Sequence, residues 1–261
     1  KTLHNTTQNA KMILNTPLRK HLQPRVGEFY HVKRLDEMVS TDPIFANCQS
    51  LHNNYTGCQA FYGVTSHMMN VAGFRSKGEF PNLYQDFLQN EGAPSILRRD
   101  NAKEETSAEV DEIHRELFIK EEWSEAYYPN QNPVHMIRYL KQATHTLLDC
   151  TGAPDSAWYH ACVYICEVHN RTADMKLKDG MTPYQMRHGV TPDISAYLQF
   201  TFWQPVVFLD TEESWPATRE RPGHWLGVAH KIGDCLTYWL YDDQTRAVLA
   251  RSVVRPFSDN K

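Results

Sequence analysis

The sequence predicts an α/β domain, a mixed sheet flanked by helices, followed by a small all-β module at the C-terminal end. Three patterns along the 261 residues indicate this fold: three consecutive strand-like runs, then alternating helices and short strands, then four further strand-like runs. Hydrophobic residues make up 41% and charged residues 22% of the chain, which excludes a disordered chain and a disulfide-stabilised mini-protein.

The first part of the predicted sheet consists of three short strands, at residues 43–50, 55–64 and 67–75. Asn53, Asn54 and Ser66 supply turn chemistry between these runs. Because short connections join antiparallel neighbours, the three strands are expected to pair in antiparallel fashion. Asp42 is expected to open the first of them.

Amphipathic helices and short strands alternate in the middle of the chain. The helix expected at residues 79–92 has apolar side chains at i, i+3, i+4, i+7 and i+8 and ends at Gly92. A short strand at 95–97 then leads into Asp100. The remaining expected elements are a helix at 110–117, a strand at 119–126, and two long helices at 133–150 and 155–169.

This order, β-β-β-α-β-α-β-α-α, is the order that an RNase H-like sheet produces. After residue 200, strand-like runs at 202–210, 223–231, 235–242 and 247–254 predict a small β module. Its expected apolar cluster comprises Trp225, Leu226, Leu236, Trp239 and Val253. The predicted division of the chain is a basic arm at 1–34, the α/β domain at 35–200 and the β module at 201–261.

Charge is distributed unevenly although the net charge is only −4. Residues 1–34 contain seven basic residues and one acidic residue, a balance of +6, which suits contact with phosphates or a solvated tail. Residues 100–125 contain ten acidic and three basic residues, a balance of −7, which is typical of a solvated helix face.

Targeting and redox signals are few. No apolar run approaches the ~20 residues that cross a bilayer, so no membrane partner is expected. The chain lacks a signal peptide and an initiator Met, which indicates a fragment of a longer intracellular polypeptide. The six cysteines include no Cys-x-x-Cys pair, so reduced thiols and no zinc site are expected.

Two carboxylates occupy the ends of strands that can be neighbours in a mixed sheet. Asp42 is placed at the first strand, and Asp100 follows the strand after the first helix. Paired carboxylates are natural ligands for Mg²⁺. Two such ions about 3.5–4 Å apart can stabilise the attacking and leaving oxygens of a phosphoryl transfer.

The segment around Asp100, residues 99–105, resembles the second-aspartate motif of copia-type LTR-retrotransposon integrases. Residues 40–45 resemble the first-aspartate segment, and the Cys58–Phe61 strand follows as it does in that family. Further similar segments follow in the same order and complete a resemblance over about 28–257: residues 128–133, 148–158, 170–172, 182–195, 202–206 and 223–227. The whole is most similar to the copia-like elements of algae and diatoms.

The resemblance implies an RNase H-like core with an Asp, Asp, Glu triad that joins element ends to target DNA by polynucleotidyl transfer. It implies Mg²⁺ or Mn²⁺ as cofactor, a homo-oligomer, and a location in the nucleus or a virus-like particle. By this resemblance, Asp42 corresponds to the first acid, which bridges two metal ions, and Asp100 to the second, which binds one. The segment 182–195 argues against a plain nuclease of the same fold.

The third acidic position departs from the family pattern. Where the family has Glu, this sequence has His135, 35 positions after Asp100. An imidazole removes one negative charge and suits Mn²⁺ or Zn²⁺ better than Mg²⁺, so binding of a second ion is expected to be weakened. Three interpretations stay open: an inactive copy, a weakly active site with His135 as ligand, or another acid such as Glu125 or Glu104 in its place.

Basic residues near these positions are candidate DNA contacts. They are Arg98, Arg99, Lys103, Arg138 and Lys141. Arg138 follows His135 by one helical turn and shares its helix face, where it can contact phosphates or form an ordinary basic rim. Two hypotheses therefore follow: an integrase core with an impaired site, or a catalytically inactive nucleic-acid-binding remnant.

Overall fold

The computed structural model describes residues 32–99, 107–123, 132–210, 216, 218–230, 232–233 and 236–257. Of the arm predicted at 1–34, residues 1–31 lie outside them, and 132–134 are described only as backbone. The strands of the first sheet are β1 (Met38–Phe45), β2 (Gly57–Gly63), β3 (Met69–Phe74), β4 (Ile96–Arg99) and β5 (Lys120–Trp123). The helices that accompany them are α3 (Phe80–Asn90), α4 (Ala108–Glu116), α5 (Asn132–Thr151), α6 (Trp158–Arg171) and α7 (Pro183–His188).

The first sheet has the strand order β3-β2-β1-β4-β5. β1 pairs antiparallel with β2, which pairs antiparallel with β3, whereas β4 runs parallel to both β1 and β5. A three-stranded meander extended by two parallel strands is the RNase H-like arrangement, so the predicted fold class is confirmed.

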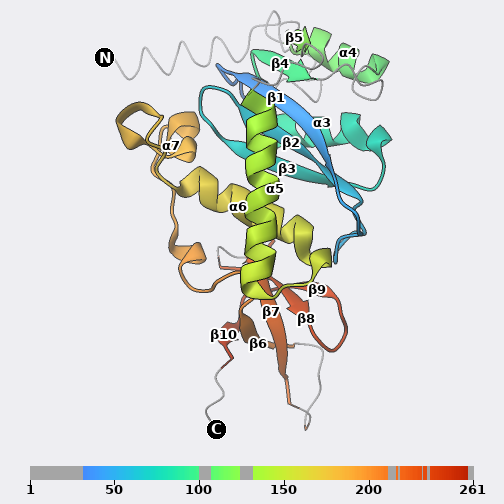
Figure 1. The fold of residues 1–261 in the computed structure, drawn as a ribbon, viewed down its shortest axis with the longest axis vertical. Coiled ribbons are helices and arrows are strands. Elements are labelled where there is room, and N and C mark those ends of the chain that lie inside the picture. The colour runs from blue at the N-terminus through green and yellow to red at the C-terminus, as the bar shows by residue number, and fades with distance from the viewer. Residues whose placement is uncertain are drawn as a thin grey trace, which may run out of the picture.

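Helices cover both faces of this sheet. On one face α3 and α4 pack against Val39, Phe61 and Leu97. On the other face α5 and α6 pack against Ile44 and Tyr62. Figure 1 shows α5 lying across the front of the sheet and continuing toward the second sheet. The central strand β1 is therefore buried on both sides, which explains why its sequence shows no simple alternation.

The periodic helices form where the apolar spacing predicts them. α3 buries Tyr84, Phe87 and Leu88, and the Ser76 and Glu79 side chains form a capping box ahead of it. In α4 the Ser107 hydroxyl accepts a hydrogen bond from the Val110 N–H at the N-terminus. No helix within the described part of the chain is long and apolar enough to cross a membrane.

The second sheet is antiparallel throughout and has the order β10-β6-β7-β8-β9. Its strands are β6 (Pro205–Leu209), β7 (Glu220–Val228), β8 (Tyr238–Asp242), β9 (Val248–Arg251) and β10 (Val254–Pro256). Trp225 and Leu226 are buried as expected. Leu236 and Val253 are exposed, so their expected place in the apolar cluster is wrong. Both lie between strands, where side-chain alternation no longer directs them inward.

The short helix α7 explains the structural role of the Thr182–Pro183 motif. Thr182 caps the helix by accepting a hydrogen bond from the Gln185 N–H, and Pro183 occupies its first turn. Gly189 ends it in the left-handed conformation, with φ 74°. This turn chemistry holds Arg187 in a fixed position on a helix of only six residues.

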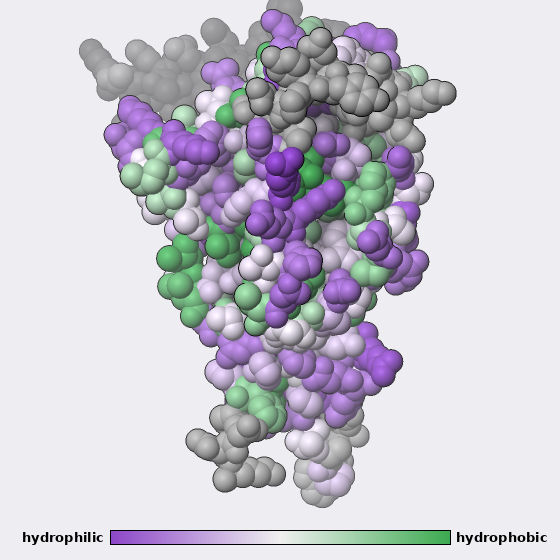
Figure 2. All heavy atoms as spheres, viewed as in Figure 1, coloured by the Kyte–Doolittle hydropathy of each residue, from purple (hydrophilic) through white to green (hydrophobic). Residues whose placement is uncertain are grey.

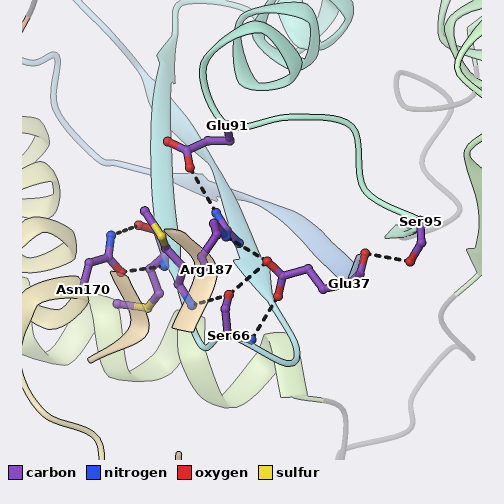
Figure 3. Close-up of polar contacts among 8 residues, drawn as sticks. Glu37, Ser66, Glu91, Ser95, Asn170 and Arg187 are labelled. Atoms are coloured by element: carbon purple, nitrogen blue, oxygen red, sulfur yellow. Dashed lines mark hydrogen bonds and ion pairs between the residues drawn. The ribbon is translucent and has the colours of Figure 1, made fainter. Parts of the chain in front are cut away.

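Arg187 connects α7 to the start of β1 through buried ion pairs. Figure 3 shows its guanidinium between the carboxylates of Glu37 and Glu91. The nitrogen-to-oxygen distances are 2.8 Å to Glu37 and 3.2 Å to Glu91. The Glu37 carboxylate also accepts hydrogen bonds from the N–H and the hydroxyl of Ser66. The network therefore joins α7, the segment before β1, the β2–β3 turn and the end of α3.

Helix α6 joins the two sheets. Ala157, just before the helix, and Ala161 within it pack against Phe202 and against Leu226 of β7. His160 is buried at the same junction, with its ring 6.4 Å from the Trp239 ring and 6.2 Å from the His52 ring. Burial, with a smaller effect from His52, lowers the pKa of His160 to about 3.

His160 is expected to make the junction sensitive to acid. In the unfolded chain His160 takes up a proton near pH 6.5, whereas the folded chain keeps it neutral down to about 3. The folded state is therefore most stable, as far as His160 is concerned, above about pH 6.5, and it loses stability as the pH decreases toward 3. In that range the equilibrium constant for folding falls by up to about tenfold per pH unit. His160→Gln should flatten the pH dependence of urea unfolding between pH 6.5 and 4. The exposed His145→Gln is the control, and equal profiles for both variants would contradict the assignment.

Candidate active site

Asp42 is the fifth residue of β1 and lies inside the strand. The expectation that Asp42 opens the strand is therefore wrong. The strand begins earlier, because Met38 to Ser40 pair with β4 and Val39 to Thr41 pair with β2. The sequence of these four residues has no strong strand pattern. Pro43 is tolerated because the described pairing on the β4 side ends at Ser40.

The Asp42 side chain lies on the face of the sheet that α5 covers. A cavity of about 20 Å³ is lined by Asp42, Ser40 and Tyr62 from the sheet and by Met136, Ile137 and Leu140 from α5. Asp42 is half-buried there and makes polar interactions. The first turns of α5 thus enclose a carboxylate at the centre of the sheet.

The second predicted acid follows β4. β4 pairs in parallel register with β1, with Ser40 opposite Arg98, and it ends at Arg99. Asp100 and Lys103 lie outside the described residues, so the expected approach of the Asp42 and Asp100 carboxyls stays a prediction. The alternative acids Glu104 and Glu125 lie outside them as well.

His135 lies in the first turn of α5, and its side chain is exposed. The next two residues of the helix, Met136 and Ile137, line the cavity beside Asp42. Among the described residues, no group of three or more His, Cys, Asp or Glu side chains is arranged to hold a metal ion. His135 as a third ligand therefore stays a prediction.

Two of the predicted basic residues lie on the solvent face of α5. Arg138 and Lys141 are exposed, and with Ile137 and Gln142 they line an open depression on the surface. Figure 2 shows hydrophilic residues along the face of the molecule that α5 occupies. This face continues from the helix turn that carries His135, so an extended anionic chain lying along it can lead toward Asp42.

Arg98 and Arg99 point to opposite faces of the sheet, as successive strand residues do. Arg98 is half-buried and pairs with Glu122 at 2.8 Å. Arg99 is fully buried, pairs with Glu121 at 2.8 Å, and lies 4.6 Å from the centre of the Trp123 ring. A buried guanidinium cannot reach a DNA phosphate, so the candidate DNA contact at Arg99 is corrected to an internal ion pair.

The Arg99 ion pair belongs to a buried polar cluster on the α4 face. His114 donates from Nδ1 to the Glu121 carboxylate, and its Nε2 lies 3.1 Å from the Tyr84 hydroxyl. Burial alone raises the pKa of Glu121, but hydrogen bonds from His114 and Arg99 outweigh burial and lower it. Glu121 is therefore held ionised as the partner of Arg99.

Sequence reasoning missed Ser40, which shares the Asp42 cavity. A serine two positions before an aspartate is a common pattern, and no sequence signal distinguishes it. Only the strand alternation that the structure reveals places the two side chains on the same face.

Comparison with known proteins finds similarity in structure alone. No family model matches the sequence, and no curated protein matches it. The integrase catalytic core of HTLV-2, solved in complex with magnesium, is similar with a TM-score of 0.46 and 17% identity over 60% of this chain and 100% of that chain.

Two other structures show comparable similarity. The match in the simian T-cell lymphotropic virus intasome, solved in complex with PP2A regulatory subunit B56 gamma, has a TM-score of 0.46 and 12% identity over 90% of this chain and 86% of that chain. The BIV integrase catalytic core has a TM-score of 0.44 and 13% identity over 58% of this chain and 93% of that chain. Likenesses of this size establish neither the family nor the function of the chain.

The different environments of Arg98 and Arg99 predict different effects on stability. Arg99→Met should lower the free energy of unfolding by about 3 kcal/mol, because it leaves Glu121 without its buried partner. Arg98→Met, which removes a partly exposed pair, should cost at most about 1 kcal/mol. Urea unfolding of both variants tests this, and an equal cost would contradict the internal role of Arg99.

Proposed function

We propose that this chain is the catalytic core of a DNA integrase of a copia-type LTR retrotransposon of the algal and diatom kind, with its metal site impaired at one position. The reaction is metal-dependent polynucleotidyl transfer of element ends to target DNA. The proposed organisation is the basic arm at 1–34, the catalytic core at 35–200 and the β module at 201–261. As part of a retroelement polyprotein, the chain acts as a homo-oligomer in the nucleus or in a virus-like particle.

The observation that carries this proposal is the parallel register of β1 and β4. Ser40 lies opposite Arg98, and Asp42 and Asp100 each follow by two positions in the sequence. Parallel strands bring residues at equivalent positions to the same edge of a sheet, which supports two carboxylates acting together. Two oxygen-donor carboxylates fit a hard divalent cation.

The residues have distinct proposed roles. Asp42 and Asp100 hold Mg²⁺ or Mn²⁺, and His135 is the third ligand, on the first turn of the helix that covers Asp42. When bound, a pair of such ions stabilises the attacking and leaving oxygens of the phosphoryl transfer. Arg98, Lys103, Arg138 and Lys141 contact the DNA backbone and orient it toward the acids.

A second candidate function is that of a nucleic-acid-binding remnant without catalytic activity. The observation that favours it is the chemistry of α5 beside Asp42. Met136, Ile137 and Leu140, which line the cavity, offer neither an oxygen nor a nitrogen donor, and the His135 side chain is exposed. Activity after restoration of an acid at position 135 decides between the two.

Substitution of the third ligand tests the catalytic proposal. His135→Glu should raise strand transfer in Mg²⁺ at least about a thousandfold, because losing a positioned metal costs several kcal/mol and each ~1.4 kcal/mol is tenfold in rate. Mn²⁺, which tolerates nitrogen ligands better, should narrow the difference. Asp42→Asn in the His135→Glu background should abolish the gained activity.

The control for this experiment is His145→Glu, the same change at an exposed position on the same helix. It should leave activity at the parent level. Equal strand transfer by the His135→Glu and His145→Glu variants would show that position 135 does not serve the site.

The basic face of α5 yields a prediction for DNA binding. Arg138→Ala and Lys141→Ala should each weaken binding to duplex DNA at all sequences and lower the slope of log K against log salt by about 1. Gln142→Ala, a neutral change in the same depression, is the control. Fluorescence anisotropy over a salt series measures both quantities, and an unchanged slope in both basic variants would contradict the assignment.

A further inference from the structure

Ser40 carries a buried hydroxyl on the same side of β1 as Asp42. The residue is 1% exposed, and its Oγ atom has no hydrogen-bond partner among the described residues. Buried hydroxyls are nearly always paired with protein groups or ordered water. An unpartnered hydroxyl therefore indicates a partner beyond the described protein atoms, such as an ordered water.

The hydroxyl of Thr41, the next residue, differs from that of Ser40 because it lies on the other face of the strand. Thr41 points to the opposite face, where its hydroxyl donates to the Ala60 carbonyl at 3.0 Å and accepts from the Gln59 amide at 2.7 Å. Both sides of β1 thus bury a hydroxyl, but of the two only the Thr41 hydroxyl has partners within the described part of the chain. The difference lies in the surroundings of Ser40.

Those surroundings include the cavity of about 20 Å³ that Ser40 shares with Asp42. A cavity needs roughly 10–15 Å³ to hold one water molecule, and the water needs at least two polar partners. The Ser40 hydroxyl and the Asp42 carboxylate supply two, and Asn70, whose buried Oδ1 also lacks a partner among the described residues, lines the same cavity. Met136, Ile137 and Leu140 contribute apolar groups to its wall. The space therefore accommodates a single water between a hydroxyl and a carboxylate.

We propose that Ser40 is a positioning residue for Asp42, acting through one ordered water held in this cavity. The Ser40 hydroxyl donates to the water, and the water donates to a carboxylate oxygen of Asp42. This bond fixes the orientation of the carboxylate. The consequence for a divalent cation rests on the proposed function, whereas the water and its effect on stability do not.

A high-resolution crystal structure of the chain without added metal tests the water directly. It should show one water within about 2.7–3.0 Å of both Ser40 Oγ and an Asp42 carboxylate oxygen. A dry cavity, or a water bound to neither group, overturns the proposal.

The variant Ser40→Ala tests the consequence, with Thr41→Val as the matched control on the opposite face. Ser40→Ala should lower the melting temperature and raise the dissociation constant for Mn²⁺, measured by calorimetry, about tenfold, as removal of a group supporting a metal ligand does. Thr41→Val should lower the melting temperature and leave the Mn²⁺ affinity unchanged.

The direction of the Ser40→Ala effect is decisive. A raised melting temperature with unchanged Mn²⁺ affinity shows that the hydroxyl is simply an unsatisfied buried group, and overturns the positioning role. If the parent chain binds no Mn²⁺, the proposed function fails. The crystallographic water and the direction of the stability change then still decide the role of Ser40.

Discussion

The pairing of β1 with a strand on each side is the constraint on which the rest of the structure depends. β1 runs antiparallel to β2 and parallel to β4, so it lies at the centre of the first sheet. Helices cover it on both faces, and successive residues in the body of the strand face one helical layer and then the other. Val39 lies toward α3 and α4, whereas Ser40 and Asp42 share a cavity with α5. A shift of one residue in this pairing would exchange the two sets and remove the carboxylate from the site.

The buried ion pairs around Arg187 fix where β1 begins. Glu37, immediately before the strand, pairs with Arg187 and accepts two hydrogen bonds from Ser66. Breaking a buried pair by removing one partner is strongly destabilising, because the remaining charge is uncompensated. Gly63 has no room for a side chain, since a Cβ there would lie 2.4 Å from the Arg187 guanidinium. The motif around Thr182 thus contributes to the site indirectly, by holding the strand that carries Asp42.

The sequence predicted the elements whose pattern is local and missed those set by tertiary pairing. The helix at 79–92 was predicted because its apolar spacing is helical, and α3 occupies Phe80–Asn90. The start of β1 was wrong because a central strand of a mixed sheet has no alternation to read. Arg99 was assigned to DNA because sequence shows a basic pair but not which face each arginine takes. Ser40 carries no distinctive signal, and α7 is too short for a periodic apolar pattern although its ends carry capping residues. The roles of both became visible only through their contacts.

The proposed catalysis requires a divalent cation held by Asp42 of β1 and by Asp100, which follows β4 in the sequence. Its most direct test is a crystal structure of the chain grown in Mn²⁺, with anomalous diffraction measured at the manganese edge. We predict an anomalous peak within metal-ligand distance of the Asp42 carboxylate, about 2.0–2.6 Å, with Asp100 as a second ligand. The Mn²⁺ concentration should be one that saturates the His135→Glu variant. An anomalous map of the parent chain without a peak at Asp42 under that condition would contradict the proposed metal site.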